Sequence, residues 1–125
     1  MKYLCMIYSE EAVFPTLPKA EVDKVMAQYQ AFGESVKKSG QLLGANRLHP
    51  THTATTIRIR DGKLSTTDGP FAETKEQLGG YYLIEAKDLN EAIQVGSRIP
   101  GAEWGCIEVR PIWERGAPPI PKAGG

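Results

Sequence analysis

Lys2-Tyr3-Leu4-Cys5-Met6-Ile7-Tyr8 is the stretch that decides the fold, because it is apolar on both of its alternating sides. Successive side chains of a β-strand point to opposite faces. Two apolar sets therefore alternate here: Tyr3, Cys5, Ile7 and Leu4, Met6, Tyr8. The segment Tyr81–Ala86 repeats the pattern. We expect both segments to be central strands of one sheet that is covered above and below.

The strongest helical pattern lies between these two strands. Pro18 suits the first turn of a helix, and Gly40 favours the left-handed conformation that ends one. Apolar residues recur at helical spacing and form one stripe: Val22, Val25, Met26, Tyr29, Phe32 and Val36. This spacing predicts an amphipathic helix of about 22 residues, roughly 33 Å long.

The middle of the chain predicts an inserted β-hairpin. Gln41–Leu48 has an extended pattern, and Asp61-Gly62 is a strong two-residue turn signal that joins Thr55–Arg60 to Lys63–Thr67. Asp68-Gly69-Pro70 then breaks the strand. We expect an ordered loop from there through Gly79-Gly80, where the glycines indicate close backbone approach to a strand or a ligand.

The last third of the chain predicts a second helix and a final strand. Asp88 and Glu91 have the spacing of a capping box, and the inward face of this helix is predicted to be Leu89, Ala92, Ile93 and Gly96. Cys106–Trp113 reads as an edge strand, because one of its sides is polar. The element order predicts a ferredoxin-like βαββαβ fold of the α+β class, with an antiparallel sheet and an inserted hairpin.

Two helices can cover only one face of such a sheet. Several large apolar side chains on the other face would then be exposed to solvent. Burial of each would contribute about 1.5–3 kcal/mol to the free energy of folding, and exposed apolar patches of this kind mark interfaces. We therefore expect a homodimer through the sheet faces, a dimeric α/β-barrel. The alternative is that the tail and the long loop cover this face. The domain is expected to span residues 1–115, with residues 116–125 a flexible Gly/Pro-rich tail.

Composition and charge exclude several classes of function. Fifteen basic and fifteen acidic side chains cancel, so no global field attracts nucleic acid or anionic lipid. The apolar beginning is too short for a membrane span and lacks the features of a signal peptide, so we expect a cytoplasmic protein. Cys5 and Cys106 are then expected to be two buried thiols, with a structural disulfide as the alternative.

A family resemblance covers nearly the whole chain, from Met1 to Trp113. Thr67–Glu76, followed by Gly79-Gly80-Tyr81, is similar to the signature of the DGPF-motif family within the YCII-related group. Ser39–Gly44 and Ile107–Ile112 fit the same pattern. The resemblance implies a ferredoxin-like α+β barrel that dimerises through its sheets.

The resemblance implies two kinds of function. Some YCII-related proteins look like small lyase-type or dehydrochlorinase-type enzymes that use a His–Asp pair, with the His near the start of the first helix. Here Leu17–Val25 contains no histidine, and Glu21 is the nearest ionisable substitute. DGPF-type proteins also look like companions of alternative sigma factors, which implies a non-catalytic regulatory module. The tail would then be an attachment segment.

Three residues are the candidate acid–base groups. Asp68 ends a strand beside a loop that can close over a ligand, although Asp before Gly-Pro also commonly caps a turn. Glu73 follows Phe71, which we expect to anchor the loop, whereas Lys75 and Glu76 read as solvated charges. His49 is a further candidate base, or else a polar loop side chain.

No cofactor or metal site is expected from the sequence. His49 and His52 are the two histidines, and they lack the further ligands that a zinc site needs. No phosphate-binding glycine loop or nucleophilic triad motif occurs. The sequence therefore predicts a small-molecule-binding protein that carries out a cofactor-free proton-transfer or elimination step. A regulatory module that acts on a protein partner such as a sigma factor is the alternative.

Overall fold

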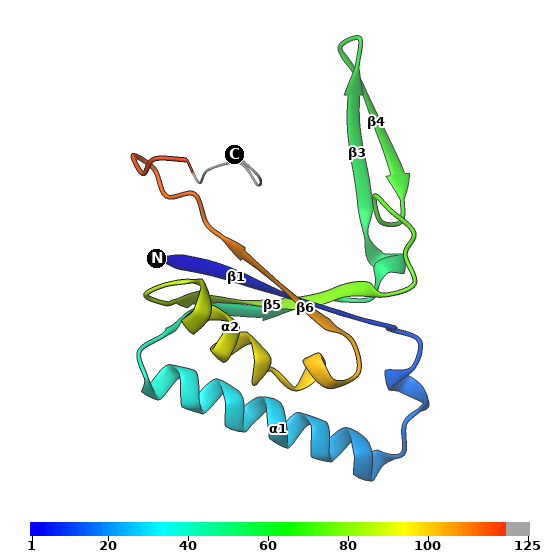
Figure 1. Ribbon diagram of the computed structural model, residues 1–125. Coiled ribbons are helices and arrows are strands. Elements are labelled where there is room, and N and C mark those ends of the chain that lie inside the picture. Colours follow the sequence, from blue (N-terminus) through cyan, green and yellow to red (C-terminus); the bar gives the residue numbers. More distant parts are fainter. Residues whose placement is uncertain (120–125) are drawn as a thin grey trace.

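The computed structural model describes residues 1–119 and has the predicted ferredoxin-like architecture. One antiparallel sheet has the strand order β2-β5-β1-β6. Its strands are β1 (Lys2–Ser9), β2 (Leu42–Arg47), β5 (Gln77–Glu85) and β6 (Cys106–Pro111). Helices α1 (Lys19–Lys38) and α2 (Leu89–Ser97) both lie against one face of this sheet (Figure 1). The α+β fold class is thereby confirmed.

The two central strands are β1 and β5, as their two-sided apolar pattern predicts. On the side of the helices, Tyr3, Cys5 and Ile84 are buried in the core. We call the other side the open face. It carries five half-buried side chains, which alternate with the core residues along the strands: Leu4, Met6, Tyr8, Tyr81 and Leu83. No helix lies over them (Figure 1).

The long helix follows its predicted boundaries closely. It starts after Pro18 and is followed by Gly40, whose φ of 78° is the left-handed conformation expected there. Val25, Phe32 and Val36 are buried against the sheet. Met26 lies in the predicted stripe but is exposed, because the sheet covers a narrower strip of the helix than the pattern indicates.

The prediction for the inward face of α2 is wrong in part. Ala92 and Gly96 are buried as expected, but Leu89 and Ile93 are exposed and Val95 takes their place. The reason is close packing, since a Cβ atom on Gly96 would lie 3.3 Å from Val109 Cγ2. This contact turns the Gly96 side of the helix toward β6.

A separate two-stranded hairpin confirms the predicted insertion. It consists of β3 (Thr55–Arg60) and β4 (Lys63–Asp68). The turn between them has positive φ at Asp61 (52°) and Gly62 (73°), as an Asp-Gly hairpin turn requires. The hairpin stands away from the main sheet, on the side opposite the helices (Figure 1).

Strand β5 starts earlier than predicted, and the expectation of a loop through Gly79-Gly80 is wrong. Gly80 pairs with Ile7 of β1 and with Arg47 of β2. A Cβ atom on Gly80 would lie 2.9 Å from the carbonyl oxygen of Asn46, whereas one on Gly79 would meet nothing within 4 Å. The close approach indicated by these glycines is therefore made by Gly80, to a neighbouring strand.

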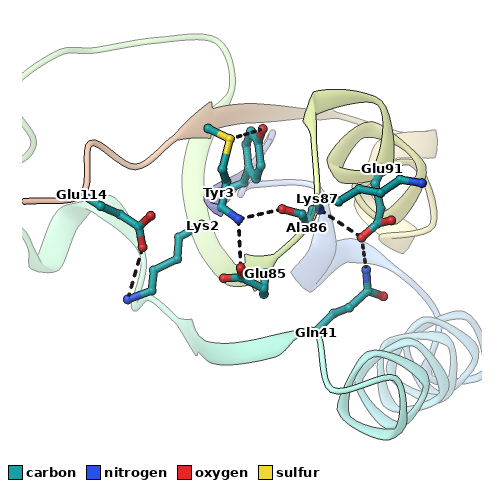
Figure 2. A network of polar contacts seen from close by, with 9 residues as sticks. Lys2, Tyr3, Gln41, Glu85, Ala86, Lys87, Glu91 and Glu114 are labelled. Carbon is teal, nitrogen blue, oxygen red and sulfur yellow. Dashed lines mark hydrogen bonds and ion pairs between the residues drawn. The ribbon is translucent and has the colours of Figure 1, made fainter. Parts of the chain in front are cut away.

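A polar network fastens the end of the sheet where α2 begins (Figure 2). Glu91 Oε1 accepts hydrogen bonds from the backbone N–H of Lys87 and from Gln41 Nε2, both at 3.2 Å. Asp88 accepts from the backbone N–H of Glu91 at 2.9 Å and so caps α2. These contacts tie the helix start to the turn before β2, and we assign them a structural role.

The cysteines are unpaired, but only Cys5 is buried. Cys106 is exposed, so the expectation of two buried thiols is wrong for it. Cys106 pairs with Tyr8 at the edge of the open face, and within the described residues no element covers that edge.

Alkaline pH is expected to destabilise the protein through Cys5. This side chain is 0% exposed, and burial raises the pKa of its thiol from 9.0 to about 11. The unfolded chain therefore loses the proton first, so stability is full below pH 9 and falls as the pH rises toward 11. The loss is about 2–3 kcal/mol at about 1.4 kcal/mol per pH unit. Urea unfolding from pH 8 to 11 measures it, and Cys5→Ala should flatten the slope. Equal slopes for both proteins would contradict the expectation.

The predicted tail falls largely outside the described residues. Within it, Ala117 accepts a hydrogen bond from Trp113 Nε1 at 3.0 Å, and residues 120–125 are outside the part of the chain that the structure describes. In residues 1–119, neither helix combines the length and the apolar character that crossing a membrane requires.

Candidate functional site

A surface pocket of about 330 Å³ lies where the base of the hairpin meets the main sheet. One wall is the short turn η2 (Thr51–Thr53), and the other is the loop that leads from β4 into β5. The side chains around it include one imidazole and one carboxylate. The lining residues are Thr51, His52, Pro70, Ala72, Glu73, Thr74 and Gln77.

Glu11, from the loop after β1, holds the two walls together. Its carboxylate accepts hydrogen bonds from the backbone N–H and the hydroxyl of Thr51. Its own backbone N–H donates to Gln77 Oε1 at 3.0 Å, and Gln77 Nε2 donates to the carbonyl of Thr74 at 2.6 Å. Hydrogen bonds therefore connect three separate segments of the chain at the pocket: the loop after β1, the turn η2 and the start of β5.

Glu73 and His52 are the titratable residues that the pocket brings together. Glu73 is one of the three residues proposed from the sequence. His49, the histidine proposed as a base from the sequence, is exposed and does not line the pocket. The histidine that does line the pocket is His52. A turn that begins at Thr51 orients these two histidines differently, which spacing along the chain does not indicate.

Asp68 is the last residue of β4 and pairs with Thr55. Within residues 1–119 its carboxylate accepts no hydrogen bond, so the turn-capping role has no support there. The turn is held instead by two other hydrogen bonds. Gly69 N–H donates to the carbonyl of Ala54 at 2.7 Å, and the Thr56 hydroxyl donates to the carbonyl of Gly69 at 2.8 Å. Asp68 lies beside the pocket-bearing loop but is not a lining residue.

The expected anchoring of the loop by Phe71 is wrong. Phe71 is 79% exposed, and its ring lies under the guanidinium group of Arg58, with 5.6 Å from Cζ to the ring centroid. A cation–π contact on the hairpin replaces the expected burial in the core. The loop is fastened by Gln77 instead.

The sequence reasoning missed Glu11, Thr51 and Gln77. A usable signal existed for Glu11, because two acidic residues follow directly after a buried strand. Polar groups at strand ends commonly lie at functional sites. Nothing in the sequence pattern signals Thr51 or Gln77.

Two phenols on the helix side of the sheet also have shifted pKa values. Burial raises the pKa of Tyr29, partly offset by a backbone hydrogen bond at Gly101 and by the charge of Arg47. Burial also raises the pKa of Tyr82. Both phenols stay protonated at neutral pH, so they are packing residues rather than bases. Within the described residues, no group of three or more His, Cys, Asp or Glu side chains could hold a metal ion.

The pocket geometry suits acid–base chemistry on a small molecule. A carboxylate and an imidazole on opposite walls can act on two sides of one bound ring, one removing a proton while the other donates one. The volume falls at the lower end of the range for small-ligand sites. The site is open to solvent on this chain alone, since its residues are mostly exposed or half-buried.

Comparisons with known proteins agree with this fold. The YCII-related domain matches residues 1–115. An uncharacterized protein of Rhizobium meliloti (strain 1021) is 39% identical over 114 residues, which cover 90% of this chain and 92% of that protein.

A solved structure has a similar fold. It is 5-chloro-2-hydroxyhydroquinone dehydrochlorinase (TftG) from Burkholderia phenoliruptrix AC1100, in complex with 2,5-dihydroxybenzoquinone. Its TM-score is 0.52 at 16% identity, over 93% of this chain and 96% of that one. This similarity concerns the fold. The family match over residues 1–115 and the 39% identity to the Rhizobium meliloti protein show that the chain belongs to the YCII-related family.

Proposed function

We propose that this protein is a cytoplasmic homodimer that binds a small organic molecule and catalyses a cofactor-free proton-transfer or elimination step. The observation that carries the proposal is the shared pocket of Glu73 and His52. The similarity in fold to a dehydrochlorinase is consistent with this reaction class. Asp68 and His49, which do not line the pocket, are proposed as auxiliary acid–base groups.

The proposed reaction needs no electron carrier. A base, Glu73 or His52, takes a proton from a hydroxyl or C–H group of the ligand. The electron pair left behind forms a new double bond, and the leaving group departs with its bonding electrons. The sum is loss of one proton and one anion, such as HCl from a chlorinated hydroxybenzene. The second residue of the pair supplies or takes up the proton that moves within the ring.

The homodimer is proposed because of the open face. Leu4, Met6, Tyr81 and Leu83 would be buried if two open faces met, and facing sheets pack about 10 Å apart. The polar side chain of Asn46 is already paired there, since its Nδ2 donates to the Tyr81 hydroxyl at 2.9 Å. The same face also carries Glu108 and Arg110, which lie opposite Met6 and Leu4 and form an ion pair with each other, so these charges already have partners before a second copy binds.

Replacement of Glu73 tests the site. With 2,5-dihydroxybenzoquinone as the binding probe and 5-chloro-2-hydroxyhydroquinone as the substrate, Glu73→Gln is expected to lower chloride release by about 100-fold, the usual effect of losing an acid–base group. His52→Asn should behave alike, and the double variant Asp68→Asn/Glu73→Gln should abolish turnover with the dimer intact.

Glu76→Gln is the matched control. Glu76 lies three residues further along the same loop but does not line the pocket, so this variant should keep wild-type activity. Wild-type behaviour of the Asp68/Glu73 double variant toward either compound would overturn the site assignment. A wild-type protein that releases no chloride would overturn this class of substrate.

The regulatory alternative gains no support from the described residues. It rests on the tail, most of which lies outside them. Recovery of a stoichiometric protein partner from cell extract, lost on removal of residues 116–125, would favour it over the enzyme.

A further inference from the structure

The hairpin β3–β4 has one apolar and one basic face. The register pairs Ile59 with Leu64 and Ile57 with Thr66, so Ile57, Ile59 and Leu64 lie on one side. We call these three residues the aliphatic face. The residues between them point to the other side, which carries three basic side chains: Arg58, Arg60 and Lys63.

In a single chain, the basic face of the hairpin is partly covered and the aliphatic face is exposed, which is the reverse of what burial of apolar surface favours. The basic side is partnered by the following loop, through the stacking of Arg58 on Phe71. The aliphatic face stays bare: Ile57 is 64% exposed, Ile59 is 63% exposed and Leu64 is 67% exposed. Among residues 1–119, no other helix or strand makes more than slight contact with β3 or β4.

An isolated two-stranded hairpin is at best marginally stable in water. This one projects from the fold (Figure 1). Its three large aliphatic side chains lie in solvent, and within residues 1–119 both of its edges are unpaired. Exposed apolar surface of this kind marks an interaction site. The aliphatic face contains no charged residue except Asp68 at its base, so its occupant must also be apolar.

We infer that the aliphatic face packs against a second copy of this chain, as an arm of the proposed dimer. The hairpin rises on the same side of the sheet as the open face (Figure 1), so a copy seated on that face would lie beside the arm. The inference rests on the proposed homodimer and adds a second contact surface to it.

The area needed for a stable dimer supports this occupant. The strands of the open face have eight, six, nine and six residues, which gives this face a plan area of roughly 450 Å². A stable interface takes about 800 Å² from each partner. The hairpin, with two strands of six residues, adds roughly 200 Å². The arm would thus enlarge the plan area of the contact by nearly half.

The same contact would also cover Asp68, beside the candidate site. Asp68 shares the side of the hairpin that carries Leu64 and Thr66, because side chains alternate along β4. A second copy seated on the aliphatic face would therefore close over the Asp68 carboxylate. On one chain alone this residue is exposed, so its carboxylate would be enclosed only in the dimer.

Substitution on the two faces of the hairpin tests the inference. In Ile57→Thr/Ile59→Thr/Leu64→Thr, β-branched residues keep the strand propensity and remove the apolar contact. The dimer dissociation constant is expected to rise at least about 30-fold in sedimentation equilibrium. The matched control is Arg60→Thr/Lys63→Thr on the basic face, which should leave the dissociation constant unchanged. In the wild type, hydrogen exchange of the amides of Ile57 and Ile59 should slow between 1 µM and 100 µM protein.

Each result is decisive. A wild-type dimer with an unchanged constant in the triple variant, and with exchange independent of concentration, would overturn the arm but leave the proposed dimer standing. A wild type that stays monomeric at 100 µM would overturn both. If the triple variant unfolds, a chain in which an Asn-Gly turn replaces residues 56–67 gives the same reading, because the main sheet pairs without these residues.

Discussion

The variant Leu83→Lys is expected to be a monomer at concentrations at which the wild-type protein is a dimer. Leu83 lies directly opposite Leu4 at the centre of the open face. In a dimer with two-fold symmetry every substitution occurs twice in one interface, so two ammonium groups would be buried without partners. We expect the dissociation constant to rise at least about 100-fold, which corresponds to about 2.8 kcal/mol.

The charge-matched control for this experiment is Ala27→Lys. Ala27 is exposed on α1, on the side of the molecule that the proposed dimer leaves free. Light scattering across a dilution series distinguishes the two variants, and the melting temperature at low concentration shows whether the Leu83 variant is folded. An unchanged dimer for Leu83→Lys would place the interface elsewhere.

The variant Gly105→Ala is expected to lose about 3 kcal/mol or more of stability, at the upper end of overpacking effects. A Cβ atom at this position would lie 2.0 Å from the carbonyl oxygen of Tyr8 and 3.0 Å from Ser9 Cβ. The backbone of residue 105 is held by a hydrogen bond from its N–H to the carbonyl of Gly101, at 2.9 Å. It therefore cannot move away without breaking that bond. For a domain of this size, the melting temperature should fall by roughly 10 °C.

Gly33→Ala gives the matched control with the opposite sign. Gly33 lies inside α1, where a Cβ atom would meet nothing within 4 Å. Alanine is favoured over glycine by about 1 kcal/mol within a helix, so this variant should be slightly more stable than the wild type. Equal denaturant midpoints for the two variants would show that the clash at Gly105 is relieved by backbone movement.

The fold was accessible from the sequence because its signals are periodic and local. The two-sided strand at Lys2–Tyr8, the stripe of α1 and the Asp61-Gly62 turn each specify an element without reference to the rest of the chain. The errors concern contacts between elements. The inward side of α2 depends on how closely Gly96 approaches Val109, and β5 extends to Gln77 because β1 and β2 pair with it there.

The candidate site was accessible only in part, for the same reason. Glu73 could be proposed because it lies in a loop with an unusual local sequence. The pairing of Glu73 with His52, rather than with His49, depends on the turn at Thr51, which Glu11 holds from forty residues away in the sequence. Such a contact leaves no periodic pattern. The burial of Phe71 was expected from its type alone, and the nearby Arg58 provides an alternative partner.

The tight seam between β2 and β5 limits how a ligand could enter. The Gly80 backbone lies against that of Asn46, and Leu48 N–H donates to the carbonyl of Gly79 at 2.9 Å, where both strands reach the pocket. The two walls of the pocket are therefore fixed to each other at this seam, and they cannot move apart there without breaking these contacts. A guest molecule would therefore enter from the side that faces solvent, where most of the lining residues are exposed, and the seam between the two strands would stay closed.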